Sequence, residues 1–342
     1  MVVLDVGTEA VKVISGEKRL LQYLDDYDAP ENYSRAVDWA FRGFANKPEK
    51  IILGLPANAL RARIVFQKFE RKNPKRVIDE KEERAIHQAV SKKAEEEVSR
   101  IFSSILGILP KDIRIVNIKI IESIIDGYEV PGLRSYGGKN LEFRILASFS
   151  SGLGEVERVV QKKAANIKLV HGAEGLILAL GDYPEGIFLD VGGEATQIFL
   201  ASGGKLIGLN EFDIGGKFFS EAISEKLGLR EKDARIFKEK YGKKELTLES
   251  SLRVKELFYF PQRAWFESLK ARLKETKESC LFSSNIILFG GGSQLPEIRE
   301  ILQEGDWGNI SFADRKPKVE ILKDPQFVPA SLIASYYAKK NY

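Results

Sequence analysis

The sequence predicts an α/β protein built from two similar lobes, and three observations support this prediction. Residues 3–13 match residues 188–198 with Leu, Asp, Val, Gly, Glu and Ala in the same places, which is an internal repeat. In each copy an apolar run ends at an aspartate, a glycine turn follows, and a second apolar run leaves, as is typical of a tight hairpin. A third glycine turn at 290–293 follows an apolar run and precedes a helix that begins near Pro296.

The two hairpins predict a site for phosphate. Their turns contain Asp5 and Gly7 in the first copy, and Asp190, Gly192 and Gly193 in the second. Glycine lets main-chain N–H groups approach an anion, and a carboxylate at a strand end can hold the cation that accompanies phosphates. A single Gly-Gly hairpin is common as a plain turn, but its repetition favours the phosphate interpretation.

Length and composition indicate a soluble globular protein of two or three domains. The 342 residues are 44% hydrophobic, and the formal net charge of +4 does not predict a nucleic-acid partner. The single cysteine, Cys280, excludes an internal disulfide and fits a reducing compartment. No signal peptide precedes the first strand, and no apolar run approaches the ~20 residues of a membrane span. We therefore expect a cytoplasmic protein.

Two Asp-Gly hairpins followed by a strand and the 290–293 turn resemble the actin-like ATPase superfamily. The resemblance implies a two-lobed fold with duplicated ribonuclease H-like lobes, in which the hairpins hold the phosphates from either side and the third turn takes the adenosine. Within the superfamily the chain most resembles the bacterial cell-division family FtsA, and next the type IV pilus family PilM.

An insertion in the first lobe makes the resemblance to FtsA more specific. The pattern predicts a helix at 83–108 and strands at 113–121 and 141–149, and the segment 125–142 is similar to the joining segment of the family's insertion. The resemblance implies an SHS2-type α+β subdomain. The implied parts are 1–56, the opening part of the first lobe; 57–147, the insertion; 148–185, the return to the first lobe; 186–325, the second lobe; and 326–342, the closing helix of the first lobe.

The resemblance implies ATP and Mg²⁺ as cofactors. Asp5 and Asp190 would hold the hydrated Mg²⁺, and Lys12 would supply a countercharge. The implied nucleotide-binding residues are Asp5, Gly7, Thr8, Lys12, Gly192, Gly193, Thr196, Gly215, Gly216, Lys238, Gly290, Gly291, Gly292 and Ser293. Glu174 is a candidate general base because actin-like enzymes place a water-orienting residue near this connection. A glutamate at a helix start is also favoured by the helix dipole alone.

The second hairpin departs from the family loop Asp-x-Gly-Gly-Gly-Thr-x-Asp. Glu194 replaces the third glycine, Ala195 replaces a hydroxyl, and Gln197 replaces the second carboxylate. A carboxylate near the phosphates repels them unless a cation intervenes, and the lost aspartate removes one orienter of Mg²⁺. We therefore expect nucleotide binding with at most weak ATPase activity.

Three functions remain open. The first is an FtsA-like scaffold that links an FtsZ-type filament to the membrane machinery in cell division, and the second is a PilM-like adaptor for pilus or secretion assembly. The third is an active sugar or acetate kinase. It needs an acidic residue in the cleft that acts as a base on the substrate, and the sequence places none there apart from Glu174. We expect either an FtsZ-like C-terminal tail or a PilN-like membrane protein as partner, and self-association into filaments.

The resemblance also bears on membrane attachment and on the partner surface. FtsA usually continues into an amphipathic membrane helix, which this chain does not show. Either the chain is a truncated or divergent member, or a membrane partner is expected to recruit the chain to the inner face of the cell membrane. The pattern predicts an amphipathic helix from Gln262 to about Lys277, with Trp265, Leu269 and Leu273 on its apolar side. On its other side, Lys270, Arg272 and Lys274 form either a basic rim for an acidic tail or a solvated helix face.

Overall fold

The computed structural model describes residues 2–24, 30–42, 48–150, 155–162, 166–182, 185–276, 281–314 and 316–340, and Cys280 lies outside them. The chain divides into two compact units. The first consists of Met1–Asn58 and Gly154–Tyr342, and the second of Ala59–Leu153, in the stretch where the sequence predicts the insertion.

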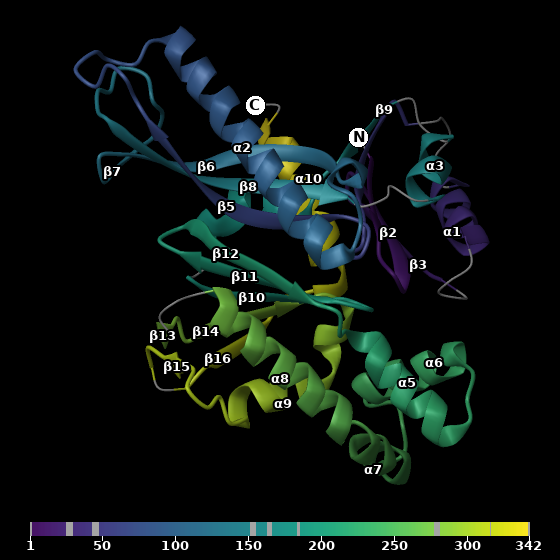
Figure 1. The fold of residues 1–342 in the computed structure, drawn as a ribbon. Coiled ribbons are helices and arrows are strands. Elements are labelled where there is room, and N and C mark those ends of the chain that lie inside the picture. The colour runs from purple at the N-terminus through teal and green to yellow at the C-terminus, as the bar shows by residue number, and fades with distance from the viewer. Residues whose placement is uncertain are drawn as a thin grey trace. The chain divides into compact units, whose positions relative to one another are not determined.

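The first unit contains two five-stranded sheets with the same topology (Figure 1). In both, three antiparallel strands are followed by two parallel ones. The first-lobe sheet runs β3 (Lys18–Tyr23), β2 (Ala10–Ser15), β1 (Val2–Val6), β4 (Lys50–Gly54) and β9 (Asn166–Leu169). The second-lobe sheet runs β12 (Lys205–Phe212), β11 (Thr196–Ser202), β10 (Gly186–Val191), β14 (Asn285–Phe289) and β16 (Lys318–Ile321). The sequence repeat thus folds twice into one topology, which confirms two similar lobes.

Helices cover these sheets, which is why the central strands are buried and, apart from Asp5 and Asp190, carry no charged residue. All five residues of β1 are buried, as are five of the six in β10. The helices of the first lobe are α1 (Pro30–Arg42), α3 (Glu155–Gln161), α4 (Gly172–Ala179) and α10 (Val328–Lys340). Those of the second lobe are α5 (Gly216–Leu227), α6 (Glu231–Gly242), α7 (Leu248–Leu257), α8 (Tyr259–Thr276) and α9 (Pro296–Glu304). A two-stranded sheet of β13 (Leu281–Phe282) and β15 (Ser311–Phe312) completes the second lobe.

Helices α4 and α10 pack closely at Gly175. A Cβ built on Gly175 would overlap the carbonyl oxygen of Leu332 and lie 3.1 Å from the nitrogen of Ile333. Gly175→Ala is therefore expected to lower the free energy of unfolding by about 2–3 kcal/mol, because backbone cannot give way as a side chain can. The control Gly172→Ala, on the same helix with no atom within 4 Å, should stay within about 0.5 kcal/mol in urea titrations. Equal losses would refute this close packing.

The second-lobe core forms around α8. The predicted apolar side of this helix is confirmed, since Trp265, Leu269 and Leu273 have no exposed surface. These residues recur at i, i+4 and i+8, so they lie on one face of the helix. The helix begins at Tyr259, three residues before the predicted start at Gln262.

The second unit is one long helix on a four-stranded sheet (Figure 1). The sheet runs β5 (Arg61–Glu70), β8 (Asn140–Ser150), β6 (Arg114–Ile125) and β7 (Tyr128–Val130), all antiparallel. Helix α2 (Glu80–Leu106) buries residues at a four-residue spacing: Ile86, Val90, Ala94, Val98 and Phe102. Asp79 caps its first turn by accepting from Glu82 N at 2.8 Å, and Gly107 ends it with φ 66°. No helix in the part of the chain that the structure describes is long and apolar enough to cross a membrane.

Candidate nucleotide-binding site

The two predicted hairpins form as expected and have matching turns. In the β1–β2 hairpin Gly7 N donates to Ala10 O at 2.9 Å, and in the β10–β11 hairpin Gly192 N donates to Ala195 O at 2.9 Å. Asp5 and Asp190 occupy equivalent places in the central strands. The amides of Gly7 and Gly192 therefore close the turns, which leaves the positions after them, Thr8 and Gly193, at the tips.

The tips of the two hairpins contact each other. A Cβ built on Gly193 would overlap Oγ1 of Thr8 and lie 2.7 Å from Cγ of Glu9. Glycine at 193 is therefore required by this close approach. In this conformation the first and second lobes meet where the phosphates are expected.

Three charged groups gather beneath the tips. Lys12 Nζ lies 2.9 Å from Asp5 Oδ2, because β1 and β2 place these residues opposite each other. Burial alone lowers the pKa of Lys12, but the attraction of Asp5, Asp190 and Glu9 is larger and raises it. Burial raises the pKa of the Asp190 carboxyl to about 7, while Lys12 lowers it and Asp5 raises it. Asp5 and Asp190 therefore both depend on Lys12 for compensating charge.

The remaining glycine turns pack backbone to backbone around the second hairpin. Gly216 N donates to Gly192 O at 2.9 Å and Lys217 N donates to Gly193 O at 2.7 Å, so the start of α5 is bonded to this hairpin. A Cβ on Gly290 would overlap Oδ1 of Asp190 and lie 2.5 Å from Val191 O. The predicted glycines are thus brought together: Gly192, Gly193, Gly215, Gly216, Gly290 and Gly292. Gly291 lies in the same turn with no atom near its Cβ position.

Lys238 reaches the glycine turns from α6, and its role in nucleotide binding stays a prediction. Its Nζ donates to Gly216 O at 2.8 Å and lies 3.5 Å from Glu9 Oε1. One turn earlier on the same helix, Arg235 Nη1 donates to Leu24 O at 2.7 Å, and its guanidinium lies 4.8 Å from the Tyr23 ring centroid. Helix α6 of the second lobe therefore bonds to the first hairpin and to the chain just after β3.

Glu194 has partners that the sequence did not predict. Its Oε1 lies 3.2 Å from Lys217 Nζ, and its Oε2 accepts from Asn58 Nδ2 at 3.1 Å. From the sequence, only Mg²⁺ or Lys12 is expected to compensate this charge. The position of Lys217 in the first turn of α5, directly after the Gly-Gly pair, was the available signal.

Two predicted ligands are buried with their hydroxyls engaged. Thr196 donates to Ile214 O at 2.7 Å and accepts from Trp265 Nε1 at 2.9 Å, which anchors the second hairpin to α8. Ser293 donates to Gly290 O at 2.7 Å, which closes the third glycine turn. Both side chains support the glycine turns from within.

Glu174 and His171 form a capping box at the start of α4. The Glu174 carboxylate accepts from His171 N at 3.3 Å, and His171 Nδ1 accepts from Ala173 N at 3.1 Å. Nε2 of His171 lies 3.0 Å from Nε2 of Gln197 on β11. Because Nδ1 already accepts, a neutral ring carries its proton on Nε2 and donates to Gln197 when the amide presents its oxygen. Glu174 is buried at the helix start, and its role as a general base stays a prediction.

The burial of His171 predicts a pH dependence of stability. Burial lowers the pKa of His171 from 6.5 to about 4. Between these values the unfolded chain binds more protons than the folded one, so stability falls as the pH drops. We expect His171 to cost about 2 kcal/mol between pH 7 and pH 5. His171→Asn, which keeps an N-cap residue but does not titrate, should lose about 2 kcal/mol less over this interval in urea titrations. An equal loss in both proteins would exclude His171 as the cause.

The residues around Asp5 and Asp190 are better suited to bind a nucleotide together with its cation than to bind a metal ion without a nucleotide. Among the described residues no group of three or more His, Cys, Asp and Glu could hold a metal ion. Mg²⁺ is usually held by one or two carboxylates together with phosphates, and Asp5 and Asp190 offer this number. Burial raises the pKa of Asp190, and a cation that arrives with a ligand would favour its charged form.

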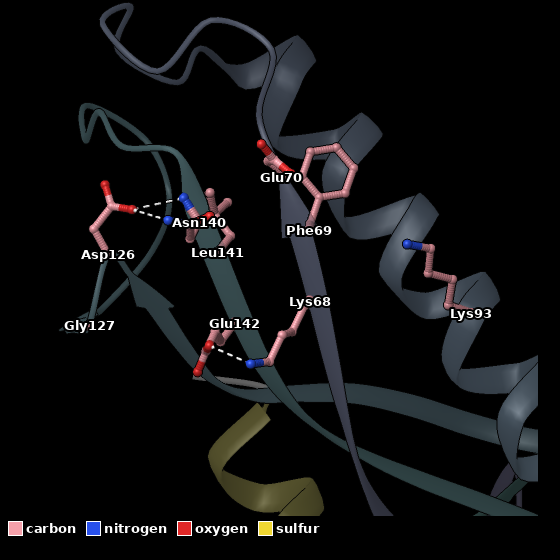
Figure 2. Close-up of a pocket in the computed structure, with 9 residues that line it drawn as sticks. All are labelled: Lys68, Phe69, Glu70, Lys93, Asp126, Gly127, Asn140, Leu141 and Glu142. Carbon is pink, nitrogen blue, oxygen red and sulfur yellow. Dashed lines mark hydrogen bonds and ion pairs between the residues drawn. The ribbon is translucent and has the colours of Figure 1, made fainter.

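The second unit has an open polar hollow of about 680 Å³ at the β5–β8 edge (Figure 2). Lys68 and Glu142 pair across it at 3.1 Å, and Lys93 lines it from α2. The Asp126 carboxylate accepts from the nitrogens of Lys139 and Asn140 at 2.9 and 2.8 Å. The carboxylates of Asp126 and Glu142 in this hollow are therefore engaged within the second unit itself.

No protein-family model matches the sequence, and no curated protein matches it. Solved structures do. A chain of the PilM-PilN type IV pilus biogenesis complex is similar over 97% of both chains, with a TM-score of 0.66 and 16% identity. MreB5 of Spiroplasma citri bound to ADP is similar over 99% of this chain and 97% of that one, with a TM-score of 0.51 and 12% identity. The chain therefore has the two-lobed actin-like ATPase fold that the sequence predicts.

Proposed function

We propose that the chain is an ATP-binding scaffold protein whose nucleotide lies between the two hairpins. The observation that supports this most strongly is the convergence of Asp5, Lys12, Asp190 and three glycine turns in an actin-like fold. Asp5 and Asp190 would hold the hydrated Mg²⁺, which would neutralise phosphate charge. The tip amides would receive phosphates, and the turn at 290–293 would lie beside the nucleoside.

ATP hydrolysis is proposed to be slow or absent. Phosphoryl transfer depends on positioned charges and a positioned water. Gln197 stands where the family has a second aspartate, and its amide lies against His171. Glu174, the predicted base, is bonded to the backbone of its own helix. A turnover assay should therefore give rates close to the buffer blank while ATP is bound.

Equilibrium binding of Mg·ATP to wild type and to Asp190→Ala tests the proposal. The substitution removes one of the two carboxylates for the cation, and we expect the affinity to fall roughly 100-fold, or about 2.7 kcal/mol. Glu249→Ala is the control, because Glu249 is exposed on α7 and pairs only locally with Arg253. Wild type that binds no ATP at millimolar concentration, or Asp190→Ala that binds as wild type does, would refute the site.

The assembly in which this scaffold acts is proposed to be of the PilM type, with an FtsA-like division role as the alternative. The full-length likeness to a chain of a pilus biogenesis complex favours the first. The expected basic rim of the FtsA interpretation is largely paired, since Lys270 lies 2.7 Å from Glu267 and Arg272 lies 2.7 Å from Glu275. Binding assays with a PilN-like protein and with an FtsZ-like C-terminal tail would separate the two roles.

A further inference from the structure

Equivalent glutamates stand at the tips of the two hairpins. The internal repeat aligns Glu9 with Glu194, just as it aligns Asp5 with Asp190. Both follow the turn glycines, where an incoming phosphate would meet the tips. A carboxylate at this place repels phosphate, so both copies of the repeat carry a charge that opposes the expected ligand.

Both carboxylates are paired with lysines of the second lobe. Glu194 Oε1 lies 3.2 Å from Lys217 Nζ in the first turn of α5. Glu9 Oε1 lies 3.5 Å from Lys238 Nζ on α6. The Lys238 side chain is only 6% exposed, so its charge is held inside the protein against Glu9 and a carbonyl oxygen. Buried pairs of this kind are screened little by salt.

The same carboxylates connect the two lobes. Glu9 belongs to the first lobe and Lys238 to the second. Glu194 belongs to the second lobe, and its other oxygen accepts from Asn58, which follows β4 of the first lobe. The lobes are thus bonded at both hairpin tips, next to the contact of Gly193 with Thr8 and Glu9.

Helix α6 extends this connection beyond the tips. Arg235 precedes Lys238 by three residues, so the two side chains leave the same face of the helix. Arg235 donates to Leu24 O at 2.7 Å, and Leu24 N in turn donates to Glu9 O at 2.9 Å. The backbone of Glu9 and its side chain are therefore both tied to α6.

We propose that Glu9 and Glu194 form an anionic latch that holds the two lobes closed in the nucleotide-free protein and that the phosphates of a nucleotide displace. The displacement rests on the proposed ATP-binding function. Phosphates brought to the tips repel both carboxylates and compete for Lys217 and Lys238. The glutamates must then leave their lysines, so phosphate binding is coupled to separation of the tips. This coupling gives the scaffold two lobe arrangements that a partner can distinguish.

The distance between the lobes tests the latch without a nucleotide. Spin labels at Lys18→Cys on β3 and Lys226→Cys on α5, in a Cys280→Ser background, report this distance by pulsed electron spin resonance. With Glu9→Gln and Glu194→Gln together, we expect a longer and broader distance distribution than in the labelled parent. A variant that exchanges the charges of one pair, Glu9→Lys with Lys238→Glu and Glu194 unchanged, should show the parent distance, because the ion pair is kept. A distribution unchanged by the double glutamine variant would overturn the proposal.

Mg·ATP titration tests the displacement. The double glutamine variant should bind ATP at least tenfold more tightly than wild type, because the phosphates no longer compete with carboxylates. Glu249→Gln, a charge removal away from the hairpins, should bind as wild type does. Equal or weaker binding by the double variant would overturn the displacement. If neither protein binds ATP at millimolar concentration, the proposed function fails together with the displacement, whereas the spin-label distances still decide whether the glutamates hold the lobes.

Discussion

Trp265→Ala is expected to lower the free energy of unfolding of the first unit by about 4 kcal/mol. The Trp265 side chain has no exposed surface and packs against Phe212 with ring centroids 6.1 Å apart. Its removal leaves a cavity in the second-lobe core, and large-to-small changes of this kind cost about 3–5 kcal/mol. It also takes the Nε1 donor from Thr196, whose hydroxyl holds the second hairpin.

Urea unfolding followed by circular dichroism measures this loss. Phe260→Ala, on the same helix, is the matched control, since Phe260 is 70% exposed and its loss should change stability by about 0.5 kcal/mol or less. A loss below about 1 kcal/mol for Trp265→Ala would show that the hairpin does not depend on this anchor.

Arg71→Ala is expected to destabilise the second unit by about 3 kcal/mol, since the change removes a buried guanidinium together with its hydrogen bonds to one carboxylate and two carbonyls. The guanidinium is fully buried and bonds the carboxylate of Glu82 through Nε and Nη2, both at 2.8 Å. It also donates to the carbonyls of Arg76 and Gly138, which ties together the loop after β5 and the loop before β8.

The tryptophans allow the two units to be followed separately. All three, Trp39, Trp265 and Trp307, belong to the first unit. In Arg71→Ala the circular dichroism should therefore show an early transition that tryptophan fluorescence does not share. Arg76→Ala removes an exposed guanidinium and should leave both signals as in wild type. A single coincident transition at the wild-type urea concentration in Arg71→Ala would contradict this role of the buried arginine.

The repeated elements were predictable from the sequence because local chemistry determines them. Glycine turns after apolar runs located both hairpins, and a four-residue apolar spacing located α2 and α8 within a few residues. Strand β5 was missed because Arg61–Glu70 carries charged residues at both ends and no regular alternation, and it buries only Ala62 and Val65. The strand forms because Arg61–Glu70 pairs with β8, which lies far along the chain.

The candidate site was only partly predictable for a similar reason. The glycines and aspartates follow from the repeat, but the partners of Glu194 come from Asn58 and Lys217, which the fold brings from distant segments. Thr196 and Ser293 lie next to glycine turns in the sequence, yet their hydroxyls face inward to Ile214 and Gly290. Sequence proximity to a turn does not fix the direction of a side chain, because that depends on which face the core covers.

Hydrogen exchange of the two hairpins, with and without Mg·ATP, tests most directly whether a nucleotide lies between them. Segments 3–13 and 186–200 should change their exchange rates together, with the same dependence on ATP concentration, and Asp190→Ala should remove both changes. The segment 90–100 of α2 serves as an internal reference and should not respond. ATP that binds while only one hairpin responds, or neither, would contradict a nucleotide held between the two lobes.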